Sequence, residues 1–327
     1  MTAAPVAPAA PVRRRGDRRL LGLLVALVAL LLLNVLVTNN FLTVQTLAVN
    51  VSQVATIAIV ALGMTLVIAT GGVDLSVGAV MAVAGALAPL IFGSAWGLAN
   101  PGLGLAASLV VPLLVAALCG LVNGALVSWA GIQPIIATLI LFISGRGIAQ
   151  VLTNGNLQTF TNPDFTWIGT GRVGGLPVQG WVALALALVI ALVVRRTLYG
   201  RYLLAVGGNE RAAALAGVPV RAAKVWTYVA CSTLAGIAGL VVVAQNSASD
   251  AARIGLLMEL NAIAAAVVGG AALAGGRAPI LGTLLGALFL QLVSYTLRAN
   301  GVPDEATFIV TAGIIVVAVW LQDSPRT

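Results

Sequence analysis

The sequence predicts an all-α, polytopic membrane protein with about ten transmembrane helices and with both termini in the cytoplasm. Three observations lead to this fold class. Apolar residues make up 60% of the 327 residues, more than the roughly 45–50% of a soluble domain. Only 17 residues are basic and 9 acidic, too few to cover the surface of a soluble protein of this length. At about 20 apolar residues per span, the chain forms roughly ten spans and leaves little for a soluble domain.

Ten apolar runs of spanning length follow one another along the chain, and we expect each to form a helix. The first run comes after a basic cluster, as the apolar core of a signal peptide would. It is long enough for a span and no small-x-small cleavage motif follows it, so we interpret it as the first span. The ten runs are residues 20–37, 47–69, 77–93, 105–128, 133–152, 178–194, 225–245, 257–274, 280–298 and 305–321.

Basic residues indicate which side of the membrane each loop faces, because cytoplasmic loops are enriched in lysine and arginine. With the N-terminus inside, ten alternating spans place thirteen of the 17 basic residues and the C-terminus in the cytoplasm. Six of the thirteen lie between residues 195 and 224, which supports an even number of spans before residue 195. The thirteen are Arg13, Arg14, Arg15, Arg18, Arg19, Arg195, Arg196, Arg201, Arg211, Arg221, Lys224, Arg277 and Arg326.

The runs and charges divide the chain into a basic cytoplasmic tail (residues 1–19), a single transmembrane domain (20–322) and a short cytoplasmic tail (323–327). Two connections are longer than a turn requires. The external loop 153–177 mixes glycine, proline and asparagine with three aromatic residues. This composition suits a loop that lies against the membrane or a partner, and equally one that only covers the protein. The cytoplasmic loop 195–224 carries the six basic residues.

A short helix is predicted within the cytoplasmic loop. Asn209 is a favourable N-cap residue, and Glu210 complements the positive end of a helix. Gly217, followed by Pro219, ends the helix. A short, water-exposed helix between two spans is suited to docking against a partner. Its interior residues are Arg211, Ala212, Ala213, Ala214 and Leu215.

The composition excludes several chemistries and predicts no metal or cofactor site on this chain. The sequence has no histidine, the commonest general base and metal ligand. Cys119 and Cys231 lie far apart in apolar runs and form no CxxC site. The only lysine, Lys224, follows Ala223, so the chain lacks the Gly-Lys-Ser/Thr of a phosphate-binding loop. We attribute the net charge of +8 to membrane orientation, not to nucleic-acid binding.

The segment Gly71-Gly72-Val73-Asp74-Leu75-Ser76-Val77-Gly78 interrupts an apolar stretch. Glycines let the backbone break or cross closely, and Gly71, Gly72 and Gly78 are expected to be structural. Such discontinuous helices often line the substrate path of transporters. A tight cytoplasmic turn in which Asp74 caps the following helix explains the segment equally well. Gly275, Gly276 and Gly282 repeat the glycine spacing, which we attribute to coincidence in a chain with 37 glycines.

Polar residues inside apolar runs are candidates for a substrate pathway, because each costs free energy in lipid unless it faces a cavity or a partner. The amides are equally able to hold helices together. Arg146 lies roughly 20 Å into its run, where a structural pairing with an acid such as Glu259 is reasonable. The candidate pathway residues are Asp74, Ser76, Asn123, Gln133, Asn261 and Gln291.

Several segments together resemble a known family, the permease subunits of ribose/galactose/xylose-type ABC sugar importers. The similarity extends from about residue 45 to residue 321. It rests on a combination of motifs that are weak singly. The matching segments are Gly63-Met64-Thr65, GGVDLSVG (71–78), Asn123-Gly124, PIIATL (134–139) with Arg146-Gly147, GRYLLAVGGNERAAALAGV (200–218) and MELNAIAAAVVGGAALAGGRAPILGTLLGAL (258–288).

The resemblance implies a multi-pass protein of the bacterial inner membrane that is a transport subunit and not an enzyme. It implies a second permease copy, or a close homologue, and a periplasmic sugar-binding protein. It further implies a cytoplasmic ATPase with two nucleotide-binding domains, which binds the ATP and magnesium. The helix 209–217 resembles the coupling helix that inserts into this ATPase. Two residues depart from the family pattern: Asn261 stands where the family often has aspartate, and Ile140 where it often has glycine.

The function hypothesis is therefore translocation of a monosaccharide by alternating access, driven by the separate ATPase. An alternative is a secondary transporter of a small polar solute driven by an ion gradient. That class requires titratable groups at mid-membrane, and only Asp74 and Glu259 are conceivable carriers. A third hypothesis, an assembly subunit without a transport path, does not account for the break at residues 71–78.

Overall fold

The computed structural model describes residues 15–323 of the chain. Residues 1–14 and 324–327, which hold most of the two predicted tails, lie outside the described part. Each of the ten predicted runs coincides for most of its length with one helix: α1 (Arg15–Val37), α2 (Val44–Ala69), α3 (Val77–Phe92), α5 (Pro101–Ser128), α6 (Pro134–Leu152), α8 (Val178–Arg196), α11 (Val220–Asn246), α12 (Met258–Val268), α13 (Ile280–Ala299) and α14 (Asp304–Asp323). The remaining elements are short: α4 (Ala95–Ala99), α7 (Pro163–Thr170), α9 (Leu198–Gly208), α10 (Glu210–Leu215), β1 (Gln158–Thr159), β2 (Arg172–Val173), β3 (Leu176–Pro177) and β4 (Ala248–Ser249).

Seven of the described helices, α1, α2, α5, α6, α8, α11 and α13, are long and apolar enough to cross a membrane. This confirms the prediction of an all-α polytopic membrane protein. Helices α3 and α12 are apolar but have only 16 and 11 residues. In α12, the run predicted over residues 257–274 is helical only from 258 to 268, because Leu257 is left-handed and Gly269 and Gly270 end the helix.

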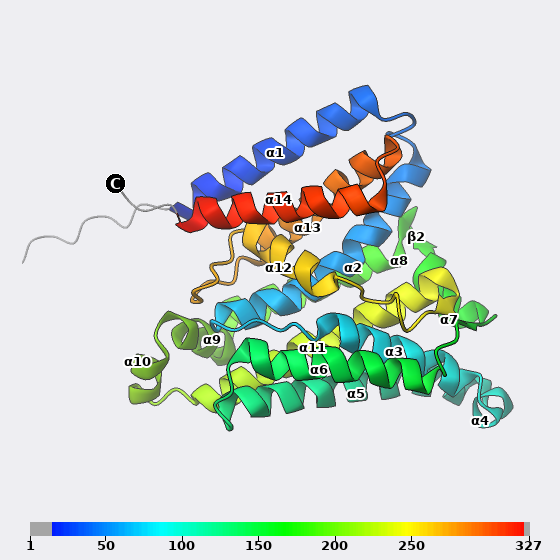
Figure 1. Cartoon of the computed structure of the whole chain (residues 1–327), viewed down its shortest axis with the longest axis horizontal. Helices are drawn as coiled ribbons and strands as arrows, with labels where there is room; N and C mark the ends of the chain where they lie inside the picture. The colour runs from blue at the N-terminus through cyan, green and yellow to red at the C-terminus, as the bar shows by residue number, and fades with distance from the viewer. Residues whose placement is uncertain (1–14, 324–327) are drawn as a thin grey trace, which may run out of the picture.

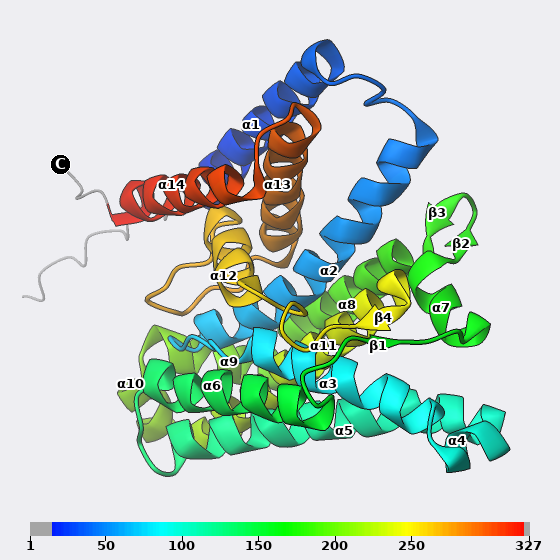
Figure 2. The same cartoon turned by 45° about the vertical axis from the view of Figure 1, so that its right-hand side comes forward.

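Helices α2 and α11 form the centre of the bundle, and most of their residues are buried. Helices α3, α5 and α6 lie on one side of them, and α1, α12, α13 and α14 on the other (Figures 1 and 2). Close approach depends on small residues, as is usual between membrane helices. A Cβ added at Gly63 of α2 would lie 2.9 Å from the Cα of Cys231 in α11. One added at Gly120 of α5 would lie 2.5 Å from the carbonyl oxygen of Tyr228.

The loops predicted to face the cytoplasm gather at one end of the bundle. The amide of Gly276 donates to the carbonyl oxygen of Ala69 at 2.9 Å, and Gly207 packs against that same carbonyl. The two glycine turns with the repeated spacing are therefore in contact. The start of α1 and the end of α14 lie at the same end as α9 and α10 (Figure 1).

The predicted external loop covers the opposite end of the bundle. Its strand β1 pairs with β4, with Gln158 opposite Ser249. Phe160 and Phe165 pack against Phe92 at the end of α3, with ring centroids 4.9 and 5.2 Å away, and Phe165 is fully buried. These two aromatic residues therefore cover the protein and do not face the membrane, whereas Trp167 is exposed.

Candidate functional site

Helices α3 and α12 are half-helices whose N-termini meet inside the bundle. A Cβ added at Gly78, in the first turn of α3, would lie 2.2 Å from the carbonyl oxygen of Gly255, just before α12. Next to this contact, Met81 of α3 packs against Gly239 of α11. Gly239 lies 19 residues into α11, roughly 28 Å from the start of that helix, so this contact is in the second half of α11. Discontinuous helices of this kind are typical of transporter binding regions.

Glu259 lies at this junction, in the first turn of α12. Its side chain is buried, and a Cβ on Gly78 would lie 2.7 Å from its Oε2 atom. Among the described residues, Oε2 has no hydrogen-bond partner. Two helix N-termini carry partial positive charge, which favours a carboxylate at this position. Glu259 thus places a buried carboxyl group at the contact between the two half-helices.

Arg146 does not pair with Glu259 in the described part of the chain. Its Nη1 atom donates to the carbonyl oxygens of Ala251 and Ile254, at 2.9 and 2.5 Å. The physical reason is the irregular backbone between β4 and α12. Carbonyls at this depth cannot reach water and must be satisfied by protein donors. The guanidinium therefore holds the non-helical segment that leads into the junction. Sequence spacing could not indicate that this segment is the partner of Arg146.

Replacing Arg146 with methionine is expected to lower the free energy of unfolding by about 3 kcal/mol or more, because two charge-assisted hydrogen bonds to buried carbonyls are lost. Arg146→Lys is expected to recover only part of this loss, since an ammonium group lacks the planar fork of donors. Thermal unfolding of the purified protein in detergent measures both changes. A melting temperature of Arg146→Met equal to that of the parent protein would contradict this role.

Three of the predicted pathway residues come together below the junction. The Oδ1 atom of Asp74 accepts hydrogen bonds from the amide and the hydroxyl of Ser76, at 2.9 and 2.6 Å. The Nδ2 atom of Asn123 donates to the Ser76 hydroxyl at 2.9 Å, and Thr138 accepts from the amide of Leu75 at 3.1 Å. All four side chains are fully buried. This cluster ties the break before α3 to α5 and α6.

Two hydrogen-bond acceptors of this cluster have no donor, and this distinguishes the cluster from simple helix packing. Among the described residues, Asp74 Oδ2 and Asn123 Oδ1 have no hydrogen-bond partner. Asp74 also does not cap α3: it binds the amide of the N-cap residue Ser76, and no side chain caps the helix. Buried acceptors without donors are costly, so they mark a place where a polar group could bind if the bundle opened.

The other predicted pathway residues lie elsewhere. Gln133 is exposed at the start of α6. Asn261 is half-buried on α12, and Gln291, on the adjacent helix α13, donates through its amide to the side chain of Gln53 on α2. Sequence analysis missed Gln53, although it too is an amide within an apolar run.

A crevice leads from the external end to the half-helix junction. Its volume is about 380 Å³, and its deepest residues, Gly255 and Met258, belong to the junction. Most of the other lining side chains are apolar, but Asn246, Asp250 and Arg253 add polar and charged groups, and Asp250 and Arg253 pair at 3.7 Å. Polar and charged groups can replace the water around a hydroxylated solute, so this crevice suits a polar substrate.

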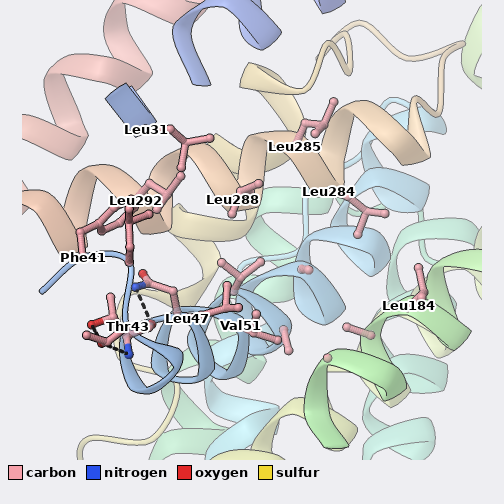
Figure 3. A pocket seen from close by; sticks show the side chains of 18 of the residues that line it. Leu31, Phe41, Thr43, Leu47, Val51, Leu184, Leu284, Leu285, Leu288 and Leu292 are labelled. Atoms are coloured by element: carbon pink, nitrogen blue, oxygen red, sulfur yellow. Dashed lines mark hydrogen bonds between the residues drawn. The ribbon is translucent and has the colours of Figure 1, made fainter. Parts of the chain in front are cut away.

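A larger cavity of about 660 Å³ lies between α1, α2, α8 and α13. Figure 3 shows leucine side chains pointing into it, including Leu31, Leu184, Leu285 and Leu288. Its polar lining is confined to Thr43, Thr46 and Asn50. A sugar here would lose hydrogen bonds to water without replacement, so this cavity does not serve as the substrate path.

The second part of the site is the predicted cytoplasmic helix, which the structure confirms as α10. The Oδ1 atom of Asn209 accepts from the amide of Ala212 at 3.0 Å, as an N-cap should. At the other end Gly217 has a φ of +80°, and the amide of Val218 donates to the carbonyl of Ala213 at 3.0 Å. Glu210 pairs with Lys224 of α11 at 2.6 Å. The apolar side chain of Leu215 is 92% exposed and is not covered by any other part of the described structure.

Helix α9 connects α10 to the bundle. A Cβ added at Gly207 would lie 1.7 Å from the carbonyl oxygen of Ala69, so the two backbones touch. The hydroxyl of Tyr199 and that of Thr227 are hydrogen-bonded at 2.8 Å. Burial raises the pKa of Tyr199 to about 12, so this hydroxyl remains protonated at neutral pH. Helix α9, which leads into α10, is therefore held against α2 and α11.

Two half-helices that meet beside a crevice in a helical membrane protein are typical of transport proteins. The chain belongs to the family of branched-chain amino acid transport system permease components, whose family model matches residues 46–319. It is thus a multi-pass transport subunit of the inner membrane and not an enzyme. Permease components of this family work in ABC importers, together with a separate ATPase and a substrate-binding protein.

Three relatives define the type of permease more closely. The chain is 42% identical to the galactofuranose transporter permease protein YtfT of Escherichia coli strain K12, over 84% of this chain and 78% of the relative. It is 40% identical to the ribose import permease protein RbsC of the same strain, over 92% and 94%. It is 35% identical to the fructose import permease protein FruF of Bifidobacterium longum, over 82% and 74%. The resemblance to ABC sugar-importer permeases is confirmed.

Proposed function

We propose that this chain carries a monosaccharide across the bacterial inner membrane by alternating access. The observation that supports this most directly is the half-helix junction beside a crevice whose lining includes Asn246, Asp250 and Arg253. The relatives whose names refer to galactofuranose, ribose and fructose support a sugar over a branched-chain amino acid. Hydroxyl groups of a sugar also match the carboxylate and amide groups near the junction.

In the proposed cycle, the substrate enters through the crevice and the contact between Gly78 and Gly255 is the closed gate. When the gate opens, Glu259 and the amides of Asn261 and Gln291 become available to the sugar hydroxyls. Ser76 and the unsatisfied oxygens of Asp74 and Asn123 are then the next polar groups toward the cytoplasm, and Gln133 lies at the exit. A sparse polar lining of this kind favours passage over tight retention.

The proposed assembly contains two permease copies, or this chain and a close homologue. A periplasmic sugar-binding protein delivers the substrate, and a cytoplasmic ATPase with two nucleotide-binding domains binds ATP and magnesium. Helix α10 docks into the ATPase. The chain crosses the bilayer ten times, with α3 and α12 each completed by the non-helical segment that leads into it. Both termini are cytoplasmic, which agrees with the start of α1 and the end of α14 lying at the α10 end (Figure 1). The transmembrane domain 20–322, which contains the external loop 153–177 and the cytoplasmic loop 195–224, is flanked by the cytoplasmic tails 1–19 and 323–327.

Uptake of radiolabelled sugars into proteoliposomes tests the proposal. We expect uptake to require ATP, the ATPase and the binding protein, and to persist after ionophores collapse every ion gradient. A ligand screen on the co-purified binding protein identifies the sugar to use. Uptake driven by an ion gradient without ATP would instead show the alternative, an ion-driven secondary transporter.

A further inference from the structure

A pocket at the cytoplasmic end combines three features that favour an anion. Its volume is about 550 Å³, and it lies between the end of α5 and the start of α11, beside α10. Its lining includes Trp129, Val220, Arg221 and Trp226. It is separate from the crevice and from the half-helix junction, and the transport cycle proposed above makes no use of it.

The first feature is uncompensated positive charge. Arg221 is exposed and has no ion pair within residues 15–323. Its neighbour Lys224, by contrast, is neutralised by Glu210 at 2.6 Å. The charge that remains on the pocket wall is therefore that of one guanidinium group, which can bind phosphate oxygens in bidentate fashion.

The second feature is the N-terminus of α11, a helix of 27 residues. Val220, Arg221 and Ala222 of its first turn all line the pocket. No side chain caps this terminus, and its first turn contains no acidic residue. The amide of Val220 donates to the carbonyl oxygen of Val218 at 2.8 Å. The partial positive charge of the helix N-terminus and the amides that follow Val220 attract an anion. They act on the same space as the Arg221 side chain.

The third feature is the pair of tryptophans, which sets the pocket at the membrane surface. Trp129 follows the last residue of α5, and Trp226 is six residues into α11; they are 66% and 62% exposed. Tryptophan is enriched where lipid headgroups meet the hydrocarbon layer. The adjacent exposed side chains of α5, such as Val122 and Leu118, continue toward the bilayer as an apolar surface.

We propose that this pocket binds the headgroup of an anionic phospholipid of the cytoplasmic leaflet. Arg221 and the start of α11 bind the phosphate, the two tryptophans flank the glycerol region, and the acyl chains follow the apolar surface of α5. Because the pocket borders α10, a bound lipid supports the helix that faces the ATPase. A lipid headgroup fits this pocket better than free phosphate does, because the cationic side chain of Arg221 lies next to the apolar surface of α5.

Quenching of tryptophan fluorescence by brominated lipids tests this assignment. The purified full-length permease is placed in phosphatidylcholine vesicles that contain increasing fractions of dibrominated phosphatidylglycerol. We expect saturable quenching at low mole fraction, and Arg221→Gln is expected to raise the half-saturating fraction about five-fold. Trp129→Phe with Trp226→Phe removes the saturable component. Arg201→Gln is the matched control, because it deletes an exposed cytoplasmic charge that does not line the pocket.

Three results would overturn the assignment. Equal half-saturating fractions for the parent protein and Arg221→Gln would show that the arginine binds no lipid. Competition by millimolar inorganic phosphate, without any preference for the lipid, would point to a free anion. Unchanged quenching together with weaker binding of the ATPase to Arg221→Gln in lipid-free detergent would assign the pocket to that protein. The outcome does not depend on which substrate the permease carries.

Discussion

Gly78→Ala is expected to unfold the protein or to destabilise it by about 3 kcal/mol or more. The added methyl group would lie 2.2 Å from the carbonyl oxygen of Gly255 and 2.7 Å from Oε2 of Glu259. The first of these is a backbone atom of a segment that Arg146 holds in place, so it cannot turn away as a side chain could. We expect a large loss of monodisperse protein, a lowered melting temperature and no measurable uptake.

Gly147→Ala is the matched control for this experiment. Gly147 lies in the interior of α6, and a Cβ added there has nothing within 4 Å. Alanine is the better helix former by about 1 kcal/mol, so this variant is expected to be as stable as the parent protein or slightly more stable. If Gly78→Ala behaved like Gly147→Ala in melting and uptake, the close contact between the two half-helices would be disproved.

Leu215→Ala is expected to reduce ATP-driven uptake about ten-fold or more and to leave the melting temperature unchanged. The side chain is 92% exposed, so its removal costs the folded permease little. Burial of a leucine in a partner surface contributes about 1.5–3 kcal/mol, which corresponds to roughly a ten-fold or larger change in affinity. Binding of the ATPase, uptake and thermal unfolding are measured on the same preparation.

Leu198→Ala provides the control for Leu215→Ala, because Leu198 is 58% exposed on α9 but is not part of α10. A second variant, Glu210→Lys with Arg211→Glu, reverses the charges at the start of α10 and breaks the pair with Lys224. It is expected to uncouple ATP hydrolysis from uptake in a folded protein. Normal uptake and normal ATPase stimulation by both altered proteins would mean that α10 is not the docking helix.

Much of the fold could be predicted because it depends on local properties of the chain. Every predicted apolar run contains a helix, since burial of backbone in lipid leaves few alternatives. The helix at residues 210–215 could be predicted from Asn209 and Gly217, because capping acts over three or four residues. Of the pathway candidates, Asp74, Ser76 and Asn123 do lie together.

The remaining features depend on contacts between residues far apart in the sequence. The run at residues 257–274 appears as one span, but its helix ends at Val268. The irregular backbone before the run is held by Arg146 of another helix, which donates to the carbonyls of Ala251 and Ile254. The common spacing of the two glycine motifs carries no information about whether they touch, yet the amide of Gly276 binds Ala69. The crevice likewise exists only once α3, α11 and the segment before α12 are assembled.

The backbone contact between Gly207 and Ala69 has a mechanical consequence. There is no space for even one carbon atom between α9 and the end of α2, and Gly276 is hydrogen-bonded to the same carbonyl. A displacement of α10 therefore cannot be taken up by free space between α9 and the end of α2. We therefore expect the end of α2 and the turn that follows α12 to move together with α10, so that a displacement of α10 is transmitted toward the half-helix junction.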